Sequence, residues 1–163
     1  MKKAEGKIVL GIDPGFGRIG FGCLGVGRGA VKCLGVGAIT TSSKDEFSSR
    51  LCQLADDLGS ILKKYQPDLV AVEKLFFAKN TKTAMQVSEA RGVILSIIAK
   101  NKIKLCEFTP AQIKKAVTGD GKADKKAVEK MICLLLGLKK SPRLDDASDA
   151  LAIALTAASL ADR

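Results

Sequence analysis

The acidic residues that follow or begin apolar segments are the best candidates for chemistry in this chain. A short apolar run ends in Asp13, and a second ends in Glu73. A third group begins a run rich in alanine and leucine and comprises Asp145, Asp146 and Asp149. Each acid alone has an ordinary explanation, because acids also occur in the turns that end strands and at the N-termini of helices. Their recurrence at three places indicates a shared site.

These acids are expected to meet at one edge of a sheet. The carboxyl ends of parallel strands lie together there, and α/β proteins place their sites at that edge. Asp146 and Asp149 are three residues apart and therefore lie on one face of a helix. Clustered carboxylates repel one another, and a hard divalent cation such as Mg²⁺ or Mn²⁺ relieves the repulsion. Two such ions about 3.5–4 Å apart are the usual arrangement for hydrolysis of a phosphodiester bond.

The composition excludes several other chemistries. The chain has no histidine, which removes His-based triads, His general bases and His metal ligands. A water activated by the metal, helped by a lysine, is then the most reasonable nucleophile. The five cysteines are scattered without a C-x-x-C pair and predict free thiols in a reducing compartment, not a disulfide or zinc site.

The charge points to an acidic partner. The 163 residues carry a formal net charge of +10, and lysines greatly outnumber acids between residues 100 and 143. Nucleic acid is the usual partner of such a surface. No apolar window approaches the ~18 residues of a membrane span, and no apolar leader follows the first methionine. We therefore expect a cytoplasmic protein that forms one domain and does not enter a membrane.

The spacing of apolar residues predicts an α/β fold that positions these acids. Three strands joined by Gly-containing turns occupy the first 40 residues and predict an antiparallel meander. Ser43 to Glu46 has the spacing of a capping box before a helix that ends near Tyr65. Two further strands, residues 69–72 and 104–108, and four further helices follow, starting near residues 81, 110, 123 and 145. Thr109-Pro110 has the favoured order of an N-cap followed by Pro at the first helical position, and Gly137 closes the helix that starts near 123. Gly92, inside the second helix, predicts close packing against a neighbour.

Four motifs in order along the chain resemble the RuvC family of bacterial Holliday-junction (crossover junction) endodeoxyribonucleases. They are Gly-Ile-Asp-Pro-Gly at 11–15, Val-Glu-Lys-Leu-Phe-Phe-Ala-Lys-Asn at 72–80, Glu-Ala-Arg-Gly at 89–92 and Asp-Asp-Ala-Ser-Asp-Ala-Leu-Ala-Ile-Ala at 145–154. The resemblance implies an RNase H-like fold over residues 1–163, with a mixed five-stranded sheet flanked by helices. It also implies an Mg²⁺-dependent homodimer that nicks two symmetric strands of a four-way junction in recombination and repair. The long second helix would form the dimer contact, and the RuvA–RuvB branch-migration complex would be a partner.

The resemblance also assigns roles to individual residues. The acids of the family match Asp13, Glu73, Asp146 and Asp149, as catalytic residues and ligands of two ions, while the role of Asp145 stays open. Phe76 matches the aromatic residue that stacks on junction bases, although Phe77 beside it leaves open which ring reaches DNA. The remaining expected DNA contacts are basic: Lys114 and Lys125 near the scissile phosphate, and Lys79, Arg91, Lys115 and Lys122 around it.

Three other classes of protein share parts of these patterns. Actin-like sugar kinases and Hsp70-type ATPases also begin with a strand ending in Asp and Gly, but they need two such domains. A YqgF-type RNase H-like nuclease acting on RNA is a closer alternative, for which the Phe-Phe-Ala-Lys-Asn loop is not expected. A junction-binding module without cleavage would not require four acids. The sequence therefore favours the junction-resolving nuclease.

Overall fold

The computed structural model describes residues 6–75, 81–140, 142 and 145–161. Its helices and strands follow one another in this order: β1 (Lys7–Asp13), β2 (Arg18–Gly27), β3 (Ala30–Thr40), α1 (Phe47–Tyr65), β4 (Leu69–Glu73), α2 (Thr81–Lys100), β5 (Lys104–Phe108), α3 (Pro110–Thr118), α4 (Lys125–Leu136) and α5 (Asp145–Ala161). None of the helices in these ranges is both long and apolar enough to cross a membrane.

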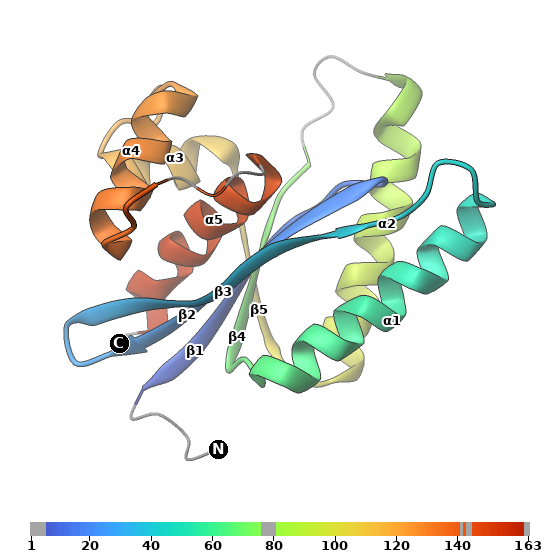
Figure 1. Cartoon of the computed structure of the whole chain (residues 1–163), viewed down its shortest axis with the longest axis horizontal. Helices are drawn as coiled ribbons and strands as arrows, with labels where there is room; N and C mark the ends of the chain where they lie inside the picture. The colour runs from blue at the N-terminus through green and yellow to red at the C-terminus, as the bar shows by residue number, and fades with distance from the viewer. Residues whose placement is uncertain (1–5, 76–80, 141, 143–144, 162–163) are drawn as a thin grey trace.

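The five strands form one mixed sheet in the order β3-β2-β1-β4-β5. β1, β2 and β3 pair antiparallel, whereas β4 pairs parallel with β1 and with β5. The expected α/β fold with an antiparallel meander followed by parallel strands is confirmed. Helices cover both faces, with α1 and α2 on one side of the sheet and α3, α4 and α5 on the other (Figure 1).

Each face of the sheet buries its own hydrophobic core. Alternation along β1 sends Val9 toward α5 and Leu10 and Ile12 toward α1 and α2. All three side chains are at most 1% exposed. β1 is therefore buried on both sides, as expected for the central strand of such a sheet, and its end is held between two packed layers.

Helix α5 lies unusually close to the sheet because glycines face it. A Cβ atom added at Gly20 of β2 would collide with the backbone carbonyl of Asp146, and one at Gly11 of β1 would collide with the carbonyl of Ala150. α5 itself buries a row of alanines against these strands. The absence of side chains at Gly11 and Gly20 thus brings the acidic start of α5 against the end of β1.

Helix termini follow the predicted chemistry in the second half of the chain. Thr109 caps α3 in a capping box with Gln112, and Pro110 occupies the first turn, as predicted. α4 starts at Lys125 after its N-cap Asp124 and ends at Leu136, and Gly137 follows as a C-cap in the left-handed conformation. The five cysteines are free, as expected.

Two local predictions from the sequence are wrong. No capping box forms at Ser43–Glu46, because α1 begins only at Phe47 and its N-cap Glu46 makes no side-chain cap hydrogen bond. A Cβ atom at Gly92 would meet nothing within 4 Å, so this glycine does not serve close packing within the chain.

Candidate active site

Two of the predicted acids lie at the ends of adjacent parallel strands. Asp13 is the last residue of β1, and Glu73 is the last residue of β4. β1 and β4 are paired up to Ile12 and Val72, so the two acids are the next residues beyond that pairing. Both side chains are half-buried. The strand register therefore sets two carboxylates side by side at the carboxyl edge of the sheet.

The start of α5 supplies the other acids from the opposite side of this edge. Asp146 and Asp149 are half-buried, whereas Asp145 is exposed. The close contact between the Asp146 backbone and Gly20 fixes where the helix begins. Because Gly20 pairs with Asp13 in the sheet, this contact also places the helix start beside the end of β1. The structure thus places the four acids Asp13, Glu73, Asp146 and Asp149 at the same edge of the sheet.

A groove of about 290 Å³ contains part of this acidic group. It is lined by Glu73 and Asp149 together with Lys114 of α3 and Lys125 of α4. Its remaining walls are mostly apolar and come from α3, α4 and α5. Two acids and two lysines in one hollow form a place where a phosphate group and a cation can be held at once.

Asp13 carries the strongest electrostatic strain of the site. Burial, and then the charges of Glu73, Asp149 and Asp146, raise the pKa of Asp13 from 3.8 to about 8, with Lys125 acting against them. A carboxyl group that is both desolvated and surrounded by carboxylates loses its proton only at a higher pH than usual. Asp13 is therefore the acid of this group on which a negative charge is least favourable.

Glu73 and Asp149 are affected in the same direction. Burial and the charge of Asp149 raise the pKa of Glu73, while Lys114 lowers it. Burial raises the pKa of Asp149, Lys125 opposes this, and Asp145 and Asp146 add to it. Raised carboxylate pKa values at neighbouring positions of a groove are a common mark of functional sites.

Basic side chains compensate the acids at the periphery of the group. Lys125 Nζ lies 3.2 Å from an oxygen of Asp145 and 3.7 Å from one of Asp149. Arg18 Nη1 lies 3.6 Å from an oxygen of Asp146. Among the described residues, Asp13 forms no ion pair. Sequence reasoning missed Arg18, although a lone arginine in the glycine-rich stretch after Asp13 was a usable signal.

The carboxylate oxygens of the four acids are suitable ligands for a divalent cation, but the side chains do not lie close enough together to bind one ion. Within the described part of the chain, no three acidic or sulfur-containing side chains are close enough together to hold one ion as they stand. Two of the acids have basic partners instead, Asp146 in Arg18 and Asp149 in Lys125. The uncompensated, buried position of Asp13 and the all-oxygen donor set favour a hard cation such as Mg²⁺ or Mn²⁺.

The expected DNA contacts are distributed unevenly. Phe76, Phe77 and Lys79 lie outside the described residues. Lys114 and Lys125 line the groove, whereas Lys115 and Lys122 are exposed on α3 and before α4.

Arg91 differs from these lysines because its guanidinium already has partners inside the protein. It forms an ion pair with Glu107 of β5 and is hydrogen-bonded to the backbone of β4.

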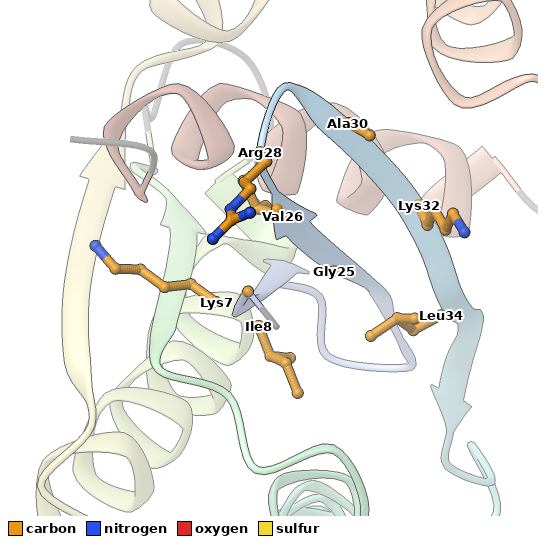
Figure 2. Close-up of a pocket in the computed structure, with 10 residues that line it drawn as sticks. Lys7, Ile8, Gly25, Val26, Arg28, Ala30, Lys32 and Leu34 are labelled. Atoms are coloured by element: carbon orange, nitrogen blue, oxygen red, sulfur yellow. The ribbon is translucent and has the colours of Figure 1, made fainter. Parts of the chain in front are cut away.

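A second hollow, of about 350 Å³, lies at the other end of the sheet (Figure 2). Lys7, Ile8, Arg28, Lys32 and Leu34 contribute to its lining, and it contains no acidic side chain. Lys7 is the first residue of β1 and Asp13 the last, so the length of this strand separates the hollow from the acids. The hollow therefore takes no part in the chemistry of the acidic group.

Comparison with known proteins gives consistent matches. A family model described as crossover junction endodeoxyribonuclease RuvC matches residues 9–157. The crossover junction endodeoxyribonuclease RuvC of Petrotoga mobilis is 49% identical over 147 residues, which are 90% of this chain and 90% of that protein. The structure of Thermus thermophilus RuvC superimposes with a TM-score of 0.88 at 34% identity, covering 95% of each chain. T. thermophilus RuvC in complex with a Holliday junction substrate gives a TM-score of 0.85 at 31% identity, again covering 95% of each chain.

Proposed function

Because the chain belongs to the RuvC family of crossover junction endodeoxyribonucleases, we propose that it resolves four-way (Holliday) DNA junctions during recombination and repair. The reaction is hydrolysis of phosphodiester bonds, with one nick in each of two symmetric strands. The observation that carries this proposal is the meeting of Asp13, Glu73, Asp146 and Asp149 beside a groove that contains two lysines. The fold similarity to a RuvC bound to a Holliday junction supports the choice of substrate.

The four acids would hold the divalent ions. We propose Mg²⁺ as the natural ion, two per site, with Mn²⁺ as a substitute. When bound, such ions activate water and neutralise charge on the reacting phosphate. Asp13 has acidic neighbours on both sides, Glu73 from β4 and Asp146 and Asp149 from α5. Asp13 would therefore be one of the ligands of these ions.

The lysines of the groove act on the phosphate. Lys114 and Lys125 lie in the same hollow as Glu73 and Asp149, so a phosphate held beside the acids is within reach of both ammonium groups. In the reaction a water oxygen forms a bond to phosphorus while the bond to the 3′ oxygen breaks. Negative charge accumulates on the phosphate oxygens and on the leaving oxygen, and positively charged groups already in position stabilise it.

We further propose that two copies of the chain act together. One chain carries one acidic group, whereas a four-way junction requires two cuts, and a two-fold dimer matches the symmetry of the junction. α2 is a suitable contact because Met85 on its outer side is 74% exposed and the space beside Gly92 is open. By family resemblance, the dimer would work with the RuvA–RuvB branch-migration complex in the bacterial cytoplasm.

The test uses a synthetic four-way junction with a mobile centre and Mg²⁺. The wild-type protein is expected to release two nicked duplexes by symmetric cuts. Glu73→Gln should bind the junction with similar affinity and cut it at least about a hundredfold more slowly, because the variant loses a metal ligand. Linear duplex DNA and an RNA–DNA hybrid of the same sequence serve as control substrates.

Several outcomes would contradict the proposal. Equal cutting of linear duplex would remove the junction specificity, and preferred cutting of the hybrid would support an RNase H-like nuclease acting on RNA. Binding of the junction by wild type without any cutting in Mg²⁺ or Mn²⁺ would leave only a junction-binding module.

A further inference from the structure

The two acid-bearing strand ends are not joined to each other by the sheet. The pairing of β1 with β4 ends at Ile12 and Val72, one residue before Asp13 and Glu73. On their outer sides, Asp13 still pairs with Gly20 and Glu73 with Phe108. The relative position of the two carboxylates therefore depends on whatever else holds the chain at these ends.

A buried arginine holds the chain just beyond Asp13. Arg50 of α1 is only 7% exposed, and its Nη2 donates to the carbonyl of Phe16 at 3.0 Å. Its Nε donates to the hydroxyl of Thr41 at 3.0 Å, and the backbone N–H of Thr41 donates to the carbonyl of Gly17 at 3.0 Å. The guanidinium carbon also lies 5.5 Å from the centre of the Phe16 ring, within reach of a cation–π interaction. The turn that links Asp13 to β2 is thus tied to a helix.

A second arginine holds the end of β4 in the same way. Arg91 of α2 is 20% exposed and pairs with Glu107 of β5, and its Nε donates to the carbonyl of Glu73 at 3.5 Å. The carbonyl belongs to the same residue as the catalytic carboxylate. Arg91 therefore links α2, the end of β4 and β5 at a single point.

We propose that Arg50 and Arg91 are positioning residues that fix the backbone at Asp13 and at Glu73, so that the two carboxylates can share divalent ions. α1 and α2 lie on the face of the sheet opposite α5 (Figure 1). The two strand ends are thus held from one face, and Asp146 and Asp149 approach from the other. The inference rests on the proposed function, since it concerns the same acids and ions.

Arginine suits this role better than lysine. Its planar group carries several donors in fixed directions, so one side chain can hold two acceptors at a defined separation. Lysine can keep the charge but not this geometry. Mutation of residues that orient metal ligands without touching the metal typically changes metal affinity or activity 10–100-fold. For Arg91, this proposal assigns a role inside the protein, whereas the sequence predicted a contact with DNA.

The experiment separates metal binding from DNA binding. Thr41→Val removes an acceptor of Arg50 and keeps the shape of the side chain, and Arg50→Lys tests the same contact if the valine variant folds poorly. Arg91→Lys tests the second contact. Thr40→Val is the matched control for Thr41→Val, because Thr40 is the neighbouring, exposed threonine and the acceptors of Arg50 are Thr41 and Phe16. Arg28→Lys is the control for the arginine variants, because Arg28 is exposed and lies with Lys7 at the end of the sheet opposite the acids. For each protein one measures Mn²⁺ binding by electron paramagnetic resonance, the Mg²⁺ concentration for half-maximal cleavage, and the junction Kd without metal.

We expect the positioning variants to bind Mn²⁺ about tenfold more weakly and to need about tenfold more Mg²⁺. Their junction Kd should stay within about twofold of wild type, and both controls should match wild type throughout. Unchanged metal binding in folded variants would overturn the inference, as would a junction Kd that weakens in step with cleavage. A wild type that neither binds Mn²⁺ nor cuts would instead overturn the proposed function.

Discussion

Replacing Asp13 with asparagine should stabilise the metal-free protein while abolishing its activity. Asp13 lies at the end of the central strand among three other acids, and burial and their charges raise its pKa to about 8. An asparagine side chain at this position would have nearly the same shape without the charge. A residue retained for metal binding at the expense of stability should show this opposition between activity and stability.

The size of the effect follows from the two pKa values. In the unfolded chain Asp13 loses its proton near its ordinary pKa of 3.8, whereas the folded protein retains it to about pH 8. Folding between these values takes up a proton, so stability is greatest below the unfolded pKa and falls as pH rises toward the folded pKa. Each pH unit costs about 1.4 kcal/mol, so wild type loses about 3 kcal/mol between about pH 5 and 7 that Asp13→Asn does not lose. For a protein of this size the difference corresponds to about 6–12 °C in Tm.

The assay is thermal or urea unfolding in EDTA from about pH 5 to 8, repeated with Mg²⁺. Asp13→Asn should gain stability over wild type as the pH rises, whereas Mg²⁺ should raise the Tm of wild type more than that of the variant. Asp56→Asn is the control, because Asp56 is an exposed acid of α1. It should stay within about 0.5 kcal/mol of wild type at every pH.

Two results would refute this reasoning. One is a variant less stable than wild type near pH 8 without metal, which would mean that the Asp13 carboxylate makes a favourable contact. The other is a stability difference that does not change with pH, which would mean that the carboxyl group titrates alike in the folded and unfolded states.

Three further predictions concern other parts of the site. Lys125→Ala should reduce cleavage at saturating Mg²⁺ at least about tenfold, because the groove loses a positive charge beside the phosphate; single-turnover cleavage measures it, and a rate within twofold of wild type would contradict it. Gly20→Ala should lower stability by at least about 2 kcal/mol and reduce cleavage, because its Cβ atom would displace the start of α5; Gly59→Ala, where a Cβ atom meets nothing within 4 Å, is the control in urea unfolding. The junction Kd should rise steeply with salt, because the lysines bind phosphates; a flat dependence in a titration would argue against the lysine-rich surface.

The sequence predicted the features that depend on local patterns. Buried strands ending in Asp13 and Glu73, and the helix start at Thr109 and Pro110, follow from periodicity and from capping chemistry. The match of motifs to a known family then implied a mixed five-stranded sheet flanked by helices, whereas the strand order β3-β2-β1-β4-β5 is known only from the structure. The start of α1 was misplaced, because the capping-box pattern at Ser43 competes with a turn in which Asp45 N–H donates to the Ser42 carbonyl.

The contacts that hold the acids were not predictable in this way. Arg50, Leu54 and Leu58 are four residues apart and all buried, so an arginine lies on the apolar stripe of α1. That spacing marks Arg50 as unusual, but its acceptors come from Phe16 and Thr41, which only the folded chain brings near. Arg18 likewise meets Asp146 only because α5 lies against β2.

The basic residues around the acids explain how a site can serve both a metal and a phosphate. Without metal, Arg18 pairs with Asp146, Lys125 is shared between Asp145 and Asp149, and Asp13 is left without an ion pair among the described residues. Divalent ions would bind the carboxylates in place of Arg18 and Lys125, and these two side chains would then be free to bind phosphate. A scissile phosphate would in turn hold the cations away from the acids and so favour the ions. Metal and DNA should therefore strengthen each other's binding by the same free energy, as linkage between two sites requires.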